Sequence, residues 1–423
     1  MPKVFSCLFA VLSLLLLLSP PTLEARSPKV QLGIDVLVDN QFDLIRDKRV
    51  GLLTHPAGVD RHSRSTVEIL YHASAVNLVA LFGPEHGIYG DEAASVPVDD
   101  RIDHRTGLPV YSLYGRYRKP TPAMLRGLDV MVIDLQDVGV RSYTFVSAMR
   151  LTIEACFENG VEVVVLDRPN PLGGLKVDGP PLDREWRSYV GAYHVPYVHG
   201  LTIGELARIS VSRRNWLEIP DEVRREGRLH VVRMRGWRRD MRWEDTGLEW
   251  IPTSPFVPTV EAAEGYAMTG LGAQIGGFQH GIGTQYPFRH IRFRGQPLEA
   301  VERELRRANI PGVQFRRTTA RTSAGTPVEG FYVEISDWER FRPTELSFHM
   351  MRIACRLRGD NPFAAASAND RDLFNKHVGS TAWWDALVQH GPNVNVEYFI
   401  HHWEQQSERF KQAAQRYWLY SHP

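Results

Sequence analysis

The sequence predicts an α/β protein with two domains. The larger N-terminal domain should be built on a doubly wound, mostly parallel sheet, and the smaller C-terminal domain should be α+β. Apolar runs rich in β-branched residues each end in a polar cluster, with helical segments between them, and they occupy residues 48–54, 77–82, 128–134 and 161–166. Continuously apolar strands that alternate with helices are typical of a parallel sheet buried on both faces.

Hydrophobic periodicity predicts the helices between these runs. In residues 143–158, apolar side chains recur at helical spacing from Phe145 to Cys156, and an Asn-Gly pair directly afterwards supplies a stop. A shorter helix is predicted at residues 64–73. The order strand, helix, strand across residues 128–167 fits a right-handed βαβ unit.

The second half of the chain has a different pattern. We expect two strands and a long helix there, at residues 229–234, 330–335 and 396–420. The glycine-rich stretch from Gly270 to Gly283 lacks both the Lys-Ser/Thr ending of a P-loop and the spacing of a dinucleotide fingerprint. We therefore predict a sheet domain at residues 28–215 and an α+β domain at residues 216–423.

The first 25 residues have the pattern of a secretory signal peptide. An early lysine precedes the apolar run from Val4 to Leu18, which is shorter than the roughly 20 residues of a membrane span, and the small residue Ala25 follows. An uncleaved membrane anchor is the alternative, which the short run disfavours. We expect a secreted or periplasmic protein without stable membrane insertion once residues 1–25 are removed.

Charge and cysteine content exclude several classes of protein. The chain has 50 Lys and Arg against 49 Asp and Glu, so no global field attracts nucleic acid or a membrane surface. Beyond the predicted signal peptide only Cys156 and Cys355 remain, too few for a disulfide framework or a zinc site. We expect two buried thiols. The sequence implies no metal and no nucleotide cofactor.

The polar clusters define the expected site, because open parallel sheets bind ligands beyond the carboxyl ends of their strands. Glu85 lies between Pro84 and His86 in a Gly-Pro-Glu-His-Gly turn directly after a predicted strand. Proline and glycine make this turn rigid and thin, which suits a carboxyl group that acts as a general acid. A loop carboxylate that caps the following segment is the alternative.

Further candidates follow the third and fourth strands. Asp134 and Asp137 offer two carboxylates, although Asp134 could instead cap the next turn. Other side chains there supply donors and acceptors for a hydroxyl-rich ligand, and arginine suits bidentate binding of a carboxylate. Together with His86, these substrate-binding candidates are Gln136, Arg141, Tyr143, Arg168, Asn170 and His199. Thr202 and Glu205 have the spacing of a capping box and are expected to be structural.

Several motifs along the chain point to one family. They include Phe82-Gly-Pro-Glu-His-Gly87, Pro109-Val-Tyr-Ser-Leu-Tyr-Gly115, Asp134-Leu-Gln-Asp-Val-Gly139, Leu166-Asp-Arg-Pro-Asn-Pro-Leu-Gly-Gly174 and His199-Gly-Leu-Thr-Ile-Gly-Glu205. From about residue 30 to its end, the chain resembles the secreted exo-β-N-acetylmuramidases of the NamZ type. The resemblance implies a Rossmann-like domain, a smaller C-terminal domain and a site between them. It also implies release of terminal β-1,4-linked N-acetylmuramic acid from peptidoglycan fragments, with Glu85 as the leading catalytic residue.

The chain departs from the family pattern in its glycine-rich region. Two positions that are typically Glu in the family are Gln274 and His280 here, and two basic positions are Ile282 and Tyr286. His280 is kept as a substrate-binding candidate. If the family's basic residues bind the lactyl carboxylate of muramic acid, this protein should discriminate less strongly for that group.

The leading interpretation is a secreted glycoside hydrolase that acts from the chain end on a peptidoglycan-derived amino-sugar glycan. Glu85 would be the acid and Asp137 or Asp134 the second carboxyl group, unless the 2-acetamido group of the sugar serves as nucleophile. The alternative is a non-catalytic or respecified cell-wall glycan-binding protein of the same fold. A nucleotide-dependent oxidoreductase would rest on fold alone and lacks its glycine fingerprint.

Overall fold

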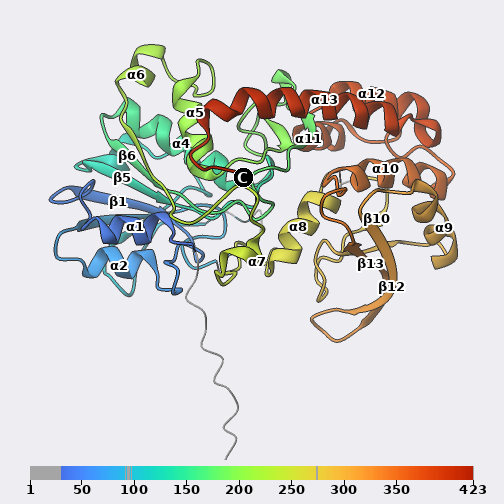
Figure 1. Cartoon of the computed structure of the whole chain (residues 1–423), viewed down its shortest axis with the longest axis horizontal. Coiled ribbons are helices and arrows are strands. Elements are labelled where there is room, and N and C mark those ends of the chain that lie inside the picture. The colour runs from blue at the N-terminus through green and yellow to red at the C-terminus, as the bar shows by residue number, and fades with distance from the viewer. Residues whose placement is uncertain (1–29, 91, 93–95, 97, 273–274, 423) are drawn as a thin grey trace, which may run out of the picture.

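The computed structural model describes residues 30–90, 92, 96, 98–272 and 275–422. The predicted signal peptide at residues 1–25 lies outside the described residues. Figure 1 shows an N-terminal domain, drawn in blue and green, beside a C-terminal domain drawn in yellow to red. Among the described residues, no helix combines the length and the apolar character that crossing a membrane needs.

In the described part of the chain, a sheet of seven strands forms the centre of the N-terminal domain. Its order is β3-β4-β2-β1-β5-β6-β9, and every neighbouring pair except β3 and β4 is parallel. The strands are β1 (Arg49–Thr54), β2 (Asn77–Gly83), β3 (Arg101–Ile102), β4 (Pro109–Ser112), β5 (Val130–Asp134), β6 (Glu162–Leu166) and β9 (Leu229–Val232). The predicted fold class and the four predicted strands are confirmed.

Helices cover both faces of this sheet, and the strand residues alternate between the two resulting cores. In β5, Val132 packs in the core that contains α1 and α2, whereas Met131 and Ile133 pack in the core that contains α4 and α5. The main helices of this domain are α1 (Gly33–Asp39), α2 (Thr66–His72), α4 (Phe145–Glu158) and α5 (Ile203–Ser212). Short elements complete it: α3 (Pro122–Leu125), α6 (Asp221–Glu226), α7 (Trp243–Thr246), β7 (Asp178–Pro181), β8 (Pro196–Val198) and η1 (Arg184–Trp186).

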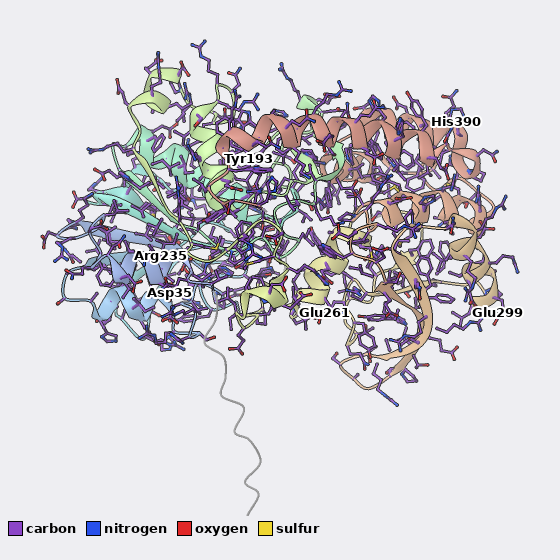
Figure 2. The ribbon with its side chains drawn as sticks, viewed as in Figure 1. Asp35, Tyr193, Arg235, Glu261, Glu299 and His390 are labelled. Atoms are coloured by element: carbon purple, nitrogen blue, oxygen red, sulfur yellow. The ribbon has the colours of Figure 1, made fainter. Side chains whose placement is uncertain are left out.

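Two of the main helices of this domain begin with side-chain caps. Asp35 of α1, labelled in Figure 2, accepts a hydrogen bond of 2.7 Å from the backbone N–H of Leu32. At the start of α5, the Thr202 hydroxyl accepts a bond of 3.2 Å from Glu205 N–H, and the Glu205 carboxylate accepts one of 3.1 Å from Thr202 N–H. The predicted capping box is therefore confirmed.

The C-terminal domain combines helices with a small antiparallel sheet. The sheet has the order β10-β11-β13-β12, from β10 (Phe278–Gln279), β11 (His290–Phe293), β12 (Val313–Arg321) and β13 (Pro327–Ile335). Its helices are α8 (Val260–Thr269), α9 (Leu298–Ala308), α10 (Glu345–Arg358), α11 (Ala368–Val378), α12 (Thr381–His390) and α13 (Val396–Ala414), with η2 (Gly391–Asn393) and η3 (Gln415–Tyr417). Cys355 of α10 and Cys156 of α4 are both buried free thiols, as predicted.

The sheet domain extends past the predicted boundary at residue 215. β9 was expected in the second domain, but it pairs in parallel with β6 and forms the last strand of the N-terminal sheet. The segment around β9 is rich in Arg and Trp, and this change of composition suggested a domain boundary before it. Parallel pairing, however, depends on the apolar strand itself, and Val232 packs in the core beneath α1.

The end of the chain returns to the N-terminal domain, and Figure 1 shows α13 running back towards α5. The Tyr420 hydroxyl donates a bond of 2.5 Å to the Asp167 carboxylate after β6 and accepts one of 3.0 Å from Met234 N–H. The Leu419 N–H donates to Glu205 at 2.8 Å. Residues near the C-terminus therefore help to hold the sheet domain together.

Candidate active site

The loops that follow β1, β5 and β6 meet at one edge of the sheet. His55, after β1, accepts a hydrogen bond of 2.9 Å at Nε2 from the backbone N–H of Gln136, after β5. The Gln136 side chain donates in turn to the carbonyl of Pro169, after β6, at 2.8 Å. The predicted convergence of polar clusters at the carboxyl ends of the strands is confirmed.

Glu85 occupies the turn directly after β2. Its side chain is 8% exposed, and Oε2 accepts a hydrogen bond of 2.7 Å from the Thr144 hydroxyl. The turn is tight because both His86 and Gly87 have positive φ angles, of 72° and 71°. Nδ1 of His86 lies 2.9 Å from the carbonyl oxygen of Glu92, so this imidazole holds the turn to the next loop.

Two tyrosines and an arginine surround the Glu85 carboxyl group. Burial raises the pKa of Tyr114, and the hydrogen bond of its hydroxyl to Glu85 raises it further, while Arg118 acts in the opposite direction. The Arg118 guanidinium lies 3.7 Å from the centre of the Tyr114 ring and 4.4 Å from that of Tyr189. The Tyr114 phenol therefore lies between the Glu85 carboxyl group and the Arg118 guanidinium.

The C-terminal domain contributes Tyr266, from α8. Its hydroxyl lies 3.0 Å from the Ser142 hydroxyl, which also lies 2.8 Å from the Tyr197 hydroxyl. Burial raises the pKa of Tyr266, and the negative charges of Glu85 and Asp137 add to the rise. Both carboxylates therefore act on one phenol, which places them around the same point at the junction of the domains.

Asp137 keeps an unused oxygen. Oδ2 accepts a bond of 2.9 Å from Gly139 N–H and lies 3.5 Å from His199 Nε2. Oδ1 is buried and, among the described residues, has no hydrogen-bond partner, and the same holds for His199 Nε2. Buried polar atoms normally have a partner, so Asp137 Oδ1 has hydrogen-bonding capacity that the described residues do not use. Tyr143 lies close by, and burial raises its pKa, with smaller contributions that include the Asp137 charge.

Asp134 and Arg168, predicted as a catalytic carboxyl group and a substrate ligand, are instead bound to each other. Arg168 donates through Nε and Nη2 to the two Asp134 oxygens at 2.6 and 2.8 Å. The Thr66 hydroxyl donates to the same carboxylate at 2.6 Å. Both side chains are at most 3% exposed, so this ion pair holds the ends of β5 and β6 together and leaves neither group for a ligand.

Three other predicted ligands also have partners within the protein. Arg141 donates to the carbonyls of Pro180, Val195 and Val378 at 2.8 Å each and to that of His377 at 3.3 Å. It therefore fastens the two domains together. The Gln136 amide donates to two carbonyls. The Asn170 side chain accepts from Leu172 N–H in its own loop and donates to the carbonyl of Leu201, in the loop after β8. The prediction that these three side chains bind substrate is therefore wrong. They instead bond to the backbone and shape the loops that hold the site.

His280 lies in the C-terminal domain. It lines a cavity of about 370 Å³ together with Ile282, Arg292 and Arg294, and burial lowers its pKa to about 4. Gln274 lies outside the described residues. Tyr286 packs against Tyr332, with ring centres 5.2 Å apart.

Several residues near Glu85 were not singled out from the sequence. They are Tyr114, Arg118, Thr144, Tyr189 and Tyr266. The only available signal was position, since Thr144 ends the polar stretch after β5 and Tyr114 lies within a quoted motif. In the described part of the chain, His, Cys, Asp and Glu side chains form no group of three or more that could hold a metal ion.

Comparisons with known proteins point to a family. The chain matches the family described as exo-beta-N-acetylmuramidase NamZ, with the N-terminal part at residues 50–261 and the C-terminal part at residues 264–420. The peptidoglycan beta-N-acetylmuramidase NamZ of Bacillus subtilis (strain 168) is 38% identical over 402 residues, which cover 94% of this chain and 92% of that protein.

Two crystal structures of DUF1343 family proteins from Bacteroides fragilis NCTC 9343 have similar folds. The first is 38% identical to this chain with a TM-score of 0.83, and the second is 26% identical with a TM-score of 0.69. Each alignment covers 93% of this chain and 99% of the other.

Proposed function

The chain belongs to the NamZ family of exo-β-N-acetylmuramidases, and we propose that it removes terminal β-linked N-acetylmuramic acid from peptidoglycan fragments. Both parts of the family match, and the Bacillus subtilis relative is a peptidoglycan β-N-acetylmuramidase. These findings favour a glycosidase over a glycan-binding protein without activity. The observation that carries the proposal is the Glu85 carboxyl group, held by Thr144 beside Tyr266 and Asp137.

Glu85 acts as the general acid in this proposal. Hydrolysis of a glycoside needs a proton on the leaving oxygen as the bond to C1 breaks. Thr144 and Tyr114 hold the Glu85 carboxyl group from two sides, so its position is set before a substrate binds. A positioned acid of this kind typically contributes ~10²–10⁴ in rate.

Asp137 supplies the second group. If water attacks C1 directly, a carboxylate must accept its proton, and if the 2-acetamido group attacks, a carboxylate can orient its N–H. Either use needs an acceptor oxygen without a protein partner, and Asp137 Oδ1 has none among the described residues. His199 Nε2 lies 3.5 Å from the other oxygen, Oδ2.

The protein should work outside the cytoplasm, where peptidoglycan lies. The pattern of residues 1–25 supports export through a cleaved signal peptide. N-terminal sequencing of protein recovered from the periplasm or the medium should start near residue 26. Recovery of the chain with Met1 intact from the cytoplasm would contradict export.

The activity is tested most directly with a disaccharide of N-acetylmuramic acid β-1,4-linked to N-acetylglucosamine. The purified mature chain should release both monosaccharides, detected by mass spectrometry. Longer fragments should lose the muramic acid only from their non-reducing ends. Saturable binding of the disaccharide without turnover would support the glycan-binding alternative and would contradict the proposal.

A further inference from the structure

Arg118 lies next to the proposed acid and has no role in the proposed reaction. Its guanidinium is held against the rings of Tyr114 and Tyr189, 3.7 and 4.4 Å from their centres. Burial raises the pKa of the Tyr114 hydroxyl, Glu85 raises it further and Arg118 lowers it, so both groups lie beside this phenol. A single phenol therefore separates the guanidinium from the carboxyl group that protonates the glycosidic oxygen.

The positive charge of Arg118 is not neutralised within the described part of the chain. No described carboxylate forms an ion pair with Arg118, whereas the adjacent Lys119 pairs with Glu158 at 2.7 Å. Arg118 is exposed, so a ligand can reach it. Because aromatic rings contact the face of the guanidinium, its edge keeps N–H donors for a planar carboxylate.

The other arginines at this edge of the sheet cannot serve the same purpose. Arg168 is paired with Asp134, and Arg141 donates to backbone carbonyls from both domains. Arg292 and Arg294 line the cavity beside His280, within the C-terminal domain. Arg118 is the arginine that reaches Glu85 through a single shared neighbour, Tyr114.

N-acetylmuramic acid differs from N-acetylglucosamine by one lactyl ether on the ring whose glycosidic bond is cleaved, and that ether ends in a carboxylate. Burying such a carboxylate in the site without a partner would be costly, so a cation near the acid is the group that would stabilise it. We infer that Arg118 binds the lactyl carboxylate and sets the preference for muramic acid over N-acetylglucosamine. This inference rests on the proposed function and assigns to Arg118 the charge that Ile282 and Tyr286 lack.

The test compares Arg118→Ala, Arg118→Lys and the wild type. Dissociation constants of free N-acetylmuramic acid and free N-acetylglucosamine are measured by calorimetry, and kcat and KM are measured on a chromogenic N-acetylmuraminide. We expect Arg118→Ala to weaken muramic acid binding about tenfold or more, since a charged hydrogen bond is lost. Binding of N-acetylglucosamine should stay within about twofold. Arg118→Lys should lie between, because it keeps charge without the bidentate fork.

Arg116→Ala is the matched control. Arg116 is also exposed and also lies against a tyrosine, with its guanidinium 5.2 Å from the Tyr117 ring centre. The Arg116→Ala variant should bind both sugars as the wild type does. Melting temperatures of all variants show whether each is folded.

Three results would overturn the inference. One is an unchanged ratio of the two dissociation constants in Arg118→Ala, and another is an equal loss for both sugars, which would mean that Arg118 acts only through Glu85. The third is loss of selectivity in Arg292→Ala or Arg294→Ala instead. Binding constants do not need turnover, so a wild type that binds muramic acid selectively without cleaving it would refute the proposed function and leave Arg118 testable.

Discussion

The Thr144 hydroxyl donates a hydrogen bond of 2.7 Å to Oε2 of Glu85 and so joins the turn after β2 to the start of α4. Thr144 is the N-cap residue of α4, yet its side chain caps no backbone N–H of that helix. Its usual structural bond is replaced by a contact with the proposed acid. The N-terminus of a helix also favours a nearby negative charge, so the carboxylate has a suitable environment after it has donated its proton.

Replacing Glu85 with Gln should remove proton donation and retain shape and the bond from Thr144. We expect kcat/KM on an N-acetylmuraminide to fall by ~10²–10⁴, with a melting temperature close to that of the wild type. Glu68→Gln is a surface control, because Glu68 is exposed and pairs only loosely with Arg105 at 3.5 Å. An active Glu85→Gln enzyme would remove Glu85 from the mechanism.

Replacing Thr144 with Val should separate positioning from acid catalysis. The loss of one hydrogen bond to a charged group is worth about 1.5–3 kcal/mol, which is roughly tenfold to a hundredfold in rate. We expect kcat to fall within that range, less than for Glu85→Gln, and KM to change little. Thr144→Ser restores the hydroxyl and should recover most of kcat. Equal loss in the Ser variant, which keeps the hydroxyl, and in the Val variant, which lacks it, would show that the loss does not come from the bond to Glu85.

Asp134 and Asp137 should respond in opposite ways to replacement by Asn. Asp137→Asn should keep its stability and lose activity roughly tenfold or more, because an amide would replace the carboxylate that acts on the substrate. Asp134→Asn would leave the buried Arg168 charge without its carboxylate, which typically costs about 3–5 kcal/mol of unfolding free energy. Urea denaturation and kcat/KM on the same preparations distinguish the two. A stable but inactive Asp134→Asn protein would return Asp134 to the active site.

The sheet could be predicted from the sequence because its signals are local. Apolar runs such as residues 130–134 carry the strand pattern in a few adjacent residues, and parallel strands place all their carboxyl ends at one edge. The edge of the sheet that holds Glu85 was therefore predictable. β9 was assigned to the other domain because strand pairing partners are not encoded locally.

The roles of individual side chains at that edge were less predictable, because they depend on segments far apart in the chain. Asp134 and Arg168 are separated by 34 residues, and Arg141 bonds to a carbonyl 237 residues away. A polar residue after a strand has the same local pattern whether it binds a ligand or a backbone carbonyl. Arg118 was missed for the same reason, since Tyr189 reaches it from a distant loop.

The interface between the domains should weaken in acid through His377 of α11. Burial, and then the charge of Arg141, lowers the pKa of His377 to about 4, from an ordinary value near 6.5. Between these values the unfolded chain binds a proton that the folded protein does not. His377 therefore makes its whole contribution to the free energy of unfolding above about pH 6.5, and this contribution is lost as the pH falls towards 4.

The effect of His377 has to be measured as a difference in stability between the wild type and a variant, because other groups titrate in the same pH range. The pKa of buried Asp167 is raised to about 6, so its contribution changes in the opposite direction, falling as the pH rises through that value. Subtracting the profile of His377→Gln from that of the wild type isolates His377. Urea denaturation from pH 7.5 to 4.5 should show the wild type losing more stability on acidification than His377→Gln, whereas His402→Gln, at an exposed position of α13, should parallel the wild type. Parallel profiles for wild type and His377→Gln would mean that burial and the charge of Arg141 do not exclude the proton from His377.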